Sequence, residues 1–453
     1  MTRFRSRFRA SLFSLAVVAL VSPAAAADTI LYSNATVIDG TGAPARPHQD
    51  ILVEGERILA IGGQGSLGDR AVGARSVDLT GRYVIPGLID SHVHLATPPN
   101  RSRAEAILRR QLYGGVTAVR DMADDLRAVG DLSRASLVGE IPAPDIYYAA
   151  LMAGPPFFQD PRVLAVSRGF QPGTAPWMQA IDKATDLRSA VTLARGTSAT
   201  AIKIYADLPA ERVRAITAEA HRQHMMIWAH SSVFPAKPLD VIAAGADAIS
   251  HVCYLGYQAQ PQNLAAYEDR TPVREELLAP SGDDPVVARL YRAMLDRGTV
   301  LDATGSLFVK FEAERKAHPD KKPLRCSGAQ TIRLTQQAVR AGVPISTGTD
   351  FVNPASGAWP EVHEELRYLA VDVGMPPLAV IHSATLVGAR AAGQAKDMGS
   401  VEAGKLANFV VLTADPLIDI GNIERIEMTV KRGREYRRAD YVPVTAKELG
   451  DDD

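Results

Sequence analysis

Cysteine is scarce in this chain of 453 residues, which contains only Cys253 and Cys326. Two cysteines cannot build the crosslinked framework of small secreted domains, and their spacing matches no zinc knuckle. An exported protein could join them in a disulfide, but we expect two unpaired thiols. Stability must then come from a hydrophobic core, and 46% apolar residues make a core of enzyme size feasible.

An excess of charge of either sign is also lacking. The formal net charge at pH 7 is −1, because 50 Lys and Arg residues face 51 Asp and Glu residues. A nucleic-acid binder needs a basic face, so this balance argues against that class of protein. We expect a small-molecule substrate and no nucleic-acid partner, and a homo-oligomer remains open.

After residue 27 the chain lacks any apolar run long enough to span a bilayer. Before that point, Arg3, Arg5, Arg7 and Arg9 precede the apolar run 12–21 and the small residues 24–27. This order is typical of a cleaved signal peptide, and no cysteine lies near the cleavage site to carry a lipid. We predict that residues 1–27 are removed and that the mature protein is exported, periplasmic or secreted, without a stable membrane anchor.

Between residues 86 and 395, short apolar strands alternate with helical patterns such as 104–113, 209–223 and 328–341. We expect eight strands, at residues 88–95, 116–122, 145–151, 201–206, 225–231, 248–253, 299–304 and 344–350. Several repeats close with a glycine, which supplies a left-handed helix cap. Eight such units predict an α/β fold, a (β/α)8 TIM barrel, with a doubly wound open sheet as the alternative.

The segments on either side of the expected barrel are rich in β-strand patterns. Candidate strands lie at residues 29–38, 50–53, 57–61 and 75–79, and again at 407–412 and 427–430. We expect residues 28–85 and 396–440 to form one small β-sandwich domain beside a barrel domain at 86–395. Three connections rich in Pro and Gly, 153–177, 256–284 and 305–327, follow strand ends and should lie over the catalytic face of the barrel.

His92 and His94 stand at the end of the first expected barrel strand, in Gly87-Leu88-Ile89-Asp90-Ser91-His92-Val93-His94. Residues two apart in a strand point to the same face, so both imidazoles can bind one metal ion. Barrel enzymes place their catalytic groups at this end of the strands. For the pair alone, two ordinary polar residues would be the favoured interpretation, but the preceding segment and the other strand ends reverse it.

Four further residues of metal-binding chemistry end other expected strands: Lys203, His230, His251 and Asp350. Each alone has an ordinary explanation, but together with the histidine pair they form a set of imidazole and carboxylate ligands suited to zinc and related divalent ions. Burial would lower the pKa of Lys203, and its neutral amine could react with carbon dioxide to form a carbamate that bridges two metals. Asp350 could also take a proton from metal-bound water, which would make it the catalytic residue.

The chain resembles the amidohydrolase superfamily, and most of all the branch of imidazolonepropionase-like proteins and exported Xaa-Pro dipeptidase-type enzymes. The resemblance covers nearly all of the chain after residue 27. It rests on Pro86 to His94, on Gly115-Val116-Thr117-Ala118-Val119-Arg120-Asp121, and on Gly399-Ser400-Val401-Glu402-Ala403-Gly404-Lys405-Leu406-Ala407-Asn408. Relatives more often carry Asp where Asn408 stands. The resemblance implies a barrel with a small β-sandwich built from both ends of the chain.

By the same resemblance, one metal ion is held by His92, His94 and Asp350, and a second by His230 and His251, with carboxylated Lys203 as the bridge. A hydroxide between two ions, expected to be zinc, attacks the scissile carbonyl, and Asp350 passes its proton to the leaving group. Two departures leave this set intact and bear on the shape of the pocket. Ser250 stands before His251 where relatives carry Glu, and residues 205–209 replace a Ser/Gly-rich segment.

The expected reaction is hydrolysis of the amide bond of a dipeptide or an N-acyl amino acid, as in Xaa-Pro dipeptidases. A free carboxylate on such a substrate needs a cation or a hydroxyl, for which Arg120, Tyr254 and Tyr257 are candidates. A salt bridge from Arg120 to Asp121 or Asp124 is an equally good interpretation. The same metal core could hydrolyse a lactone, carbamate, cyclic imide or phosphoester. A barrel that binds a ligand without turnover is disfavoured, because all six ligand positions are filled.

Overall fold

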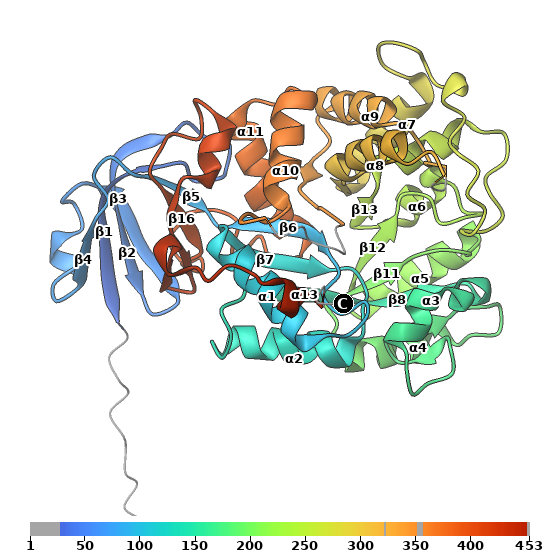
Figure 1. The fold of residues 1–453 in the computed structure, drawn as a ribbon, viewed down its shortest axis with the longest axis horizontal. Helices are drawn as coiled ribbons and strands as arrows, with labels where there is room; N and C mark the ends of the chain where they lie inside the picture. The colour runs from blue at the N-terminus through green and yellow to red at the C-terminus, as the bar shows by residue number, and fades with distance from the viewer. Residues whose placement is uncertain (1–27, 321–322, 351–356, 451–453) are drawn as a thin grey trace, which may run out of the picture.

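The computed structural model describes residues 28–320, 323–350 and 357–450, so the expected signal peptide, residues 1–27, lies outside the described residues. Figure 1 shows a β-rich lobe, in which the first strands of the chain meet the last, beside a larger body of strands and helices. Within the described ranges, no helix combines the length and the apolar character needed to cross a membrane.

The larger body is built on eight parallel strands. They are β6 (Leu88–Val93), β7 (Val116–Asp121), β8 (Asp145–Ala153), β11 (Ala201–Ile204), β12 (Met226–His230), β13 (Ala248–Ser250), β14 (Val300–Asp302) and β15 (Ile345–Ser346). Each pairs in parallel with the next, from β6 to β15. The amide of Ser91 donates to the Thr347 carbonyl at 2.7 Å, and that of Asp350 donates to the His92 carbonyl at 2.9 Å. These two bonds nearly close the barrel. The prediction of a TIM barrel is therefore confirmed, and the alternative, a doubly wound open sheet, is not observed in the described residues.

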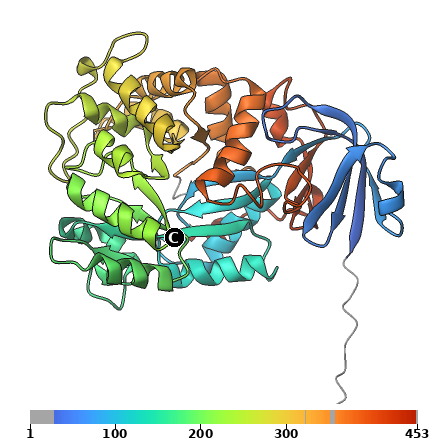
Figure 2. The same cartoon turned by 180° about the vertical axis from the view of Figure 1, so that it is seen from behind.

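Helices surround these strands on the outside, as the two opposite views show (Figures 1 and 2). They are α1 (Arg101–Tyr113), α2 (Leu126–Leu137), α3 (Pro161–Val166), α4 (Leu187–Gly196), α5 (Ala210–Arg222), α6 (Pro238–Ala244), α7 (Pro285–Arg297), α8 (Gly305–Ala317), α9 (Gly328–Ala341), α10 (Val362–Arg367), α11 (Pro377–His382), α12 (Gly388–Ala391) and α13 (Ala446–Leu449). Left-handed glycines end α6, α7 and α9, at Gly245, Gly298 and Gly342. These are the helix caps that the sequence predicts.

The barrel interior is filled in layers, because alternate residues of a strand point to the same side. Ala201, Trp228, Ala248 and Val300 form one buried cluster and come from four neighbouring strands. Two residues further along these strands stand Lys203, His230, Ser250 and Asp302. Alternation therefore places a polar layer above an apolar one, nearer the carboxyl ends of the strands. This layering is the physical reason that the candidate site forms at this end of the barrel.

The smaller lobe is one mixed sheet made from both ends of the chain. Its strands are β1 (Thr29–Val37), β2 (Arg46–Glu54), β3 (Arg57–Gly63), β4 (Arg75–Asp78), β5 (Tyr83–Pro86), β16 (Phe409–Leu412), β17 (Ile426–Lys431) and β18 (Arg434–Arg437). The sheet folds over its own core, because Tyr32 of β1 reaches Glu435 of β18 with a 3.0 Å hydrogen bond although other strands lie between them. The pairing of the two terminal segments is as the sequence predicts.

The three long connections contain structure of their own. The first contains α3 and the short strands β9 (Thr174–Ala175) and β10 (Met178–Ala180). Strand β10 pairs in parallel with the last residues of β8. The third opens with the helix α8, where we expected a loop. Residues of all three connections line a cavity beside the barrel's polar layer, including Phe157, Tyr267 and Phe308. The expectation that these connections cover the catalytic face is therefore confirmed.

The expectation of two unpaired thiols is wrong, because Cys253 and Cys326 form a disulfide with Cα atoms 6.1 Å apart. The two residues are separated by 73 positions in the chain. Cys253 follows β13, Cys326 precedes α9, and both side chains are buried. The fold of the second and third connections brings them to a separation that a disulfide can bridge. A spacing of this kind carries no local signal in the sequence.

Candidate metal centre

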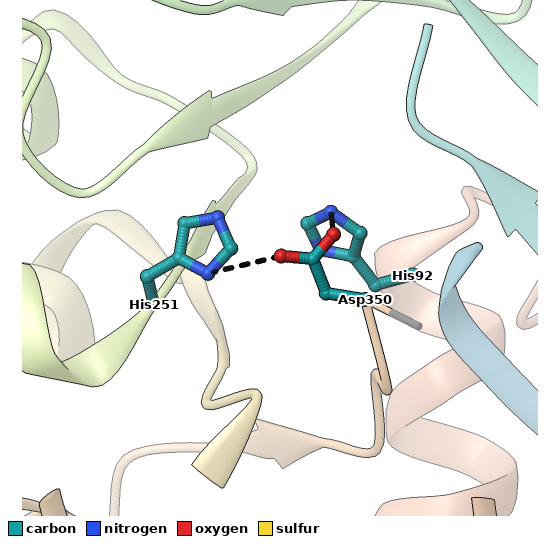
Figure 3. Close-up of side chains that lie close together, drawn as sticks. All are labelled: His92, His251 and Asp350. Carbon is teal, nitrogen blue, oxygen red and sulfur yellow. Dashed lines mark ion pairs between the residues drawn. The ribbon is translucent and has the colours of Figure 1, made fainter. Parts of the chain in front are cut away.

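Asp350 lies at the meeting point of three histidines. Its Oδ1 atom is 3.3 Å from Nε2 of His92 and 3.4 Å from Nε2 of His94, and its Oδ2 atom is 3.9 Å from Nδ1 of His251. Figure 3 shows the carboxylate between the rings of His92 and His251. Ligand atoms of His92, His251 and Asp350 all lie within 4.8 Å of one another. Four of the six residues predicted as ligands therefore share one small volume.

Two buried carboxylates orient the first histidine pair. Nδ1 of His92 is 2.8 Å from Asp302, and Nδ1 of His94 is 2.8 Å from Asp124. When the far nitrogen of an imidazole is held in this way, Nε2 is left as a lone-pair donor with a fixed direction, which is the usual support of a metal-binding histidine. We did not anticipate either carboxylate from the sequence, although Asp302 lies within the seventh expected strand and Asp124 follows the second.

His230 and Lys203, the other two predicted ligands, are buried close to the same groups. The ring centroid of His230 lies 4.8 Å from that of His251. Among the described residues, neither Nδ1 of His230 nor Nζ of Lys203 has a hydrogen-bond partner, and both side chains are buried. Buried polar atoms are almost always satisfied in folded proteins. These two unpaired atoms therefore fit a site that a metal ion and a modified lysine would complete.

Burial favours the neutral form of three nitrogen donors of the site, His230, His251 and Lys203. It lowers the pKa of His251 to about 3 and holds the pKa of His230 well below its usual value. It also lowers the pKa of Lys203 to about 7. A neutral imidazole can donate a lone pair to a metal, and a neutral lysine amine can react with carbon dioxide. The charge state of all three side chains therefore suits the predicted ligand roles.

At His94 and Asp350, neighbouring groups shift the pKa in the direction opposite to the effect of burial. Burial alone would lower the pKa of His94, but Asp124 and Asp350 outweigh it and raise that pKa to about 10. Burial alone would raise the pKa of Asp350, but the neighbouring imidazoles of His92, His94 and His251 hold it far below its usual range. Asp350 is therefore ionised, as a metal-binding carboxylate must be.

The backbone at the ends of three neighbouring strands adopts a left-handed conformation that is uncommon for residues other than glycine. The φ angles are +73° at His251, +48° at Thr304 and +54° at Asp350. Such conformations cost about 1–3 kcal/mol each and cluster at functional sites. At His251 the turn redirects the side chain, because alternation places the preceding Ser250 toward the interior. The Oγ1 atom of Thr304 then holds His251 Nδ1 at 2.9 Å.

The three predicted substrate contacts occupy different places. Tyr254 lines the cavity beside the metal ligands. Tyr257 is buried outside that lining, and its hydroxyl donates to the Thr271 carbonyl at 2.7 Å. Arg120 is fully buried, and its guanidinium donates to the carbonyls of Ser91 and Ala391 at 2.8 and 3.1 Å. The structure therefore brings one of the three to the cavity.

A cavity of about 280 Å³ opens over the predicted metal ligands. His94, His230, His251 and Asp350 face it, and aromatic side chains form much of its wall: Phe157, Tyr205, Tyr254, Tyr267, Phe308 and Phe311. Two cations, Arg162 and Arg270, also reach its lining. Apolar walls with a few convergent polar groups are the usual form of a small-molecule site. Apart from Tyr254, these wall residues were not singled out from the sequence as substrate contacts; Tyr205 follows β11, and the other four come from the long connections.

A barrel with this donor set at its carboxyl end defines a metal-dependent hydrolase. The model of the amidohydrolase family matches residues 83–436, so the chain belongs to that family. It is accordingly a hydrolase that acts on carbon–nitrogen bonds. The resemblance noted from the sequence motifs is confirmed.

Individual relatives agree with this assignment. An imidazolonepropionase from Anaeromyxobacter dehalogenans is 26% identical over 403 residues, which cover 84% of this chain and 89% of that protein. A solved Xaa-Pro dipeptidase with bound methionine in its active site is 22% identical, with a TM-score of 0.70, over 90% of this chain and 100% of that one. Ochratoxinase from A. niger is 20% identical, with a TM-score of 0.72, over 91% and 96%. At these identities the solved structures show a shared fold.

Proposed function

We propose that this chain is an exported binuclear amidohydrolase that cleaves the amide bond of a dipeptide or an N-acyl amino acid. One observation carries the proposal: His92, His94 and His251 converge on Asp350, whose side chain faces an aromatic-walled cavity. A cavity of this size suits a small molecule better than a folded polypeptide.

In this proposal two zinc ions occupy the site. His92, His94 and Asp350 would hold one, His230 and His251 would hold the other, and a carbamate on Lys203 would supply further oxygen ligands. Neutral imidazoles and carboxylates are ligands that zinc prefers. The unpaired Nζ of Lys203 and its pKa of about 7 support the carbamate. Bound ions of this kind polarise a scissile carbonyl and lower the pKa of water, which is the chemistry that the protein groups would use.

In this proposal Asp350 is the proton carrier. Its Oδ1 atom faces His92 and His94, while Oδ2 lies on the side of His251. Because the carboxylate is ionised and also lines the cavity, it can accept a proton from the attacking water and deliver it to the leaving nitrogen. The aromatic wall would exclude bulk water and hold the apolar part of the substrate while this transfer occurs.

Metal analysis and a substrate screen test the proposal together. Purified protein should contain close to two divalent ions per chain. It should hydrolyse members of a panel of dipeptides and N-acyl amino acids, and a chelator should abolish that hydrolysis until zinc is restored. Hydrolysis confined to lactones or phosphotriesters in the same panel would contradict the proposed substrate class. A protein that binds no metal after zinc supplementation would contradict the mechanism.

The carbamate on Lys203 has its own test. Lys203→Ala should remove most of the activity and the second metal ion, and added short carboxylic acids should restore part of both by replacing the missing oxygens. Lys203→Met is the matched variant that fills the same space without an amine. Full activity and metal content in either variant would exclude a bridging role for this lysine.

Export is supported by the disulfide, because such bonds persist in oxidising compartments and are rare in the cytosol. When the full chain is expressed in a bacterial host, the mature protein should be recovered outside the cytoplasm. Its N-terminus should lie near Ala27 or Asp28. A cytoplasmic product that retains residues 1–27 would contradict export.

A further inference from the structure

Arg270 stands where two cavities meet. The first, of about 280 Å³, contains the metal ligands, and the second, of about 540 Å³, lies beside it. The two share four lining residues, Tyr254, Arg270, Phe308 and Phe311. Arg270 is the cation of this shared lining, and the other three are aromatic. A substrate that extends from the metal ligands into the second cavity would pass its side chain.

The guanidinium of Arg270 is available to a ligand. Within the described ranges it forms no hydrogen bond or ion pair, and its Nε atom is buried without a partner. Its closest aromatic contact is the ring of Tyr267, 5.4 Å from the guanidinium carbon. A buried donor that lacks an acceptor is unfavourable, so an anionic ligand that supplies one would be favoured.

The neighbouring arginines already have partners. Arg162, the other cation of the first cavity, is paired with Asp160 at 2.6 Å. Arg325, which lines the second cavity, donates to the hydroxyl of Tyr257 and to two backbone carbonyls. Arg120 is fully buried in the barrel interior and cannot reach either cavity. Arg270 therefore differs from the cations around it in having no internal acceptor.

The backbone on both sides of Arg270 is fixed by hydrogen bonds. Arg325 donates to the carbonyls of Tyr267 and Asp269 at 2.6 and 3.1 Å. The hydroxyl of Tyr257 donates to the carbonyl of Thr271 at 2.7 Å. Arg325 precedes Cys326, whose disulfide ties it to the segment after β13. A ligand-binding side chain is effective when its support is rigid before binding, and this loop provides such support.

We propose that Arg270 binds the free carboxylate of the substrate and so selects acidic substrates over neutral ones. The inference rests on the proposed function, because that carboxylate belongs to the amino-acid half of a dipeptide or an N-acyl amino acid. The planar guanidinium offers parallel N–H donors that match both oxygens of a carboxylate. The aromatic side chains around it hold the apolar groups of the same molecule.

Binding of two matched analogues tests the proposal without turnover. N-benzylleucine and N-benzylleucinol contain no amide bond, and they differ only in the carboxylate, which the second replaces with a hydroxymethyl group. Calorimetry on the zinc-loaded protein should show that the acid binds more tightly than the alcohol. In Arg270→Gln the affinity for the acid should fall by about tenfold or more, while that for the alcohol should stay the same.

Two further variants sharpen the result. Arg315→Gln removes a cation that lines the second cavity alone, so it should leave both affinities unchanged. Arg270→Lys keeps the charge but loses the paired donors, so it should retain part of the preference for the acid. The proposal is overturned if Arg270→Gln weakens both ligands equally, if Arg315→Gln has the same effect as Arg270→Gln, or if the wild-type protein binds the acid no better than the alcohol.

Hydrolysis of N-benzoylleucine and N-benzoylleucinol separates this inference from the proposed function. Arg270→Gln should raise KM for the acid with little change in kcat, and should leave the alcohol unaffected. If the wild-type protein hydrolyses no amide but still prefers the acidic analogue through Arg270, the proposed reaction fails and the binding role stands. If amides are hydrolysed but Arg270→Gln changes KM for the acid and the alcohol equally, the binding role fails and the reaction stands.

Discussion

His92 and Asp302 form a buried pair in which Nδ1 of the ring lies 2.8 Å from Oδ2 of the carboxylate. The same oxygen accepts the hydroxyl of Ser250 at 2.9 Å. A glutamate at position 250, which the family resemblance implies there, would place a second carboxylate against Asp302. The small serine instead supports the carboxylate that orients His92. Ser250 is thus linked to the candidate metal site through Asp302.

Asp302→Asn should weaken metal binding, and it should also lower stability because it leaves the buried Arg120 without its charged partner. The amide preserves the shape of the side chain but removes the charge that holds the His92 ring, so metal affinity should fall by roughly 10–100-fold. Titration against a competing chelator measures this affinity. Asp283→Asn, an exposed aspartate paired with Arg340, is the control and should leave the affinity unchanged. Equal affinity in the Asp302→Asn variant would show that His92 needs no such support.

The barrel and its ligand set could be predicted because both rest on local patterns. Alternation along a strand puts His92 and His94 on one face, and the carboxyl end of each strand is where parallel strands of a barrel bring side chains together. All eight expected strands are present, although most are shorter than expected at one or both ends. Strand ends are determined by packing and backbone turns, such as the left-handed residue at His251, which local patterns do not reveal.

The partners of these residues could not be predicted, because they depend on contacts between distant segments. Arg120 illustrates the difference. The sequence offered the neighbouring carboxylates Asp121 and Asp124, whereas the structure pairs it with Asp302 at 3.5 Å, 182 positions away. The disulfide and the exposure of Arg270 to the cavity have the same origin. Each follows from the path of a long connection, whose conformation has no periodic signal in the sequence.

Arg120→Met should destabilise the fold. The guanidinium donates to two backbone carbonyls, lies 4.7 Å from the Trp228 ring and faces Asp302 inside the barrel. Removing one member of a buried charged pair leaves the other uncompensated, at a cost of roughly 3–5 kcal/mol. Urea unfolding measures the loss. A variant of normal stability that binds acidic substrates poorly would instead support the role predicted for Arg120 from the sequence.

Removal of the disulfide should lower stability and loosen the support of Arg270. The crosslink spans 73 positions, and loss of a bond that closes a loop of this order costs roughly 2–5 kcal/mol. The double variant Cys253→Ser, Cys326→Ser should therefore unfold at lower urea concentration. Arg325 adjoins Cys326 and holds the backbone beside Arg270. The affinity of the double variant for N-benzylleucine should therefore fall more than its affinity for N-benzylleucinol. Identical unfolding curves for the variant and the wild-type protein would contradict the expected crosslink.

Glu365 gives the protein a pH dependence that is separate from the metal ligands. Its buried carboxylate accepts the amides of Gly305 and Ser306 at 3.1 and 2.8 Å, at the start of α8. Burial raises its pKa from 4.5 to about 7. Between these values the folded protein binds more protons at this residue than the unfolded chain does. The stabilising contribution is therefore complete below pH 4.5 and is lost as the pH rises through about 7.

Glu365→Gln removes this titration, so its free energy of unfolding relative to the wild-type protein should increase with pH. From a pKa of 4.5 to one of about 7, the linked change is about 3 kcal/mol. Urea unfolding of both proteins at pH 4.5 and at pH 8 measures the difference. Glu364→Gln, at an exposed neighbouring position, should follow the wild-type protein at both values. If the Glu365→Gln and wild-type stabilities change in parallel with pH, the carboxylate is ionised throughout the range and its two amide donors outweigh burial.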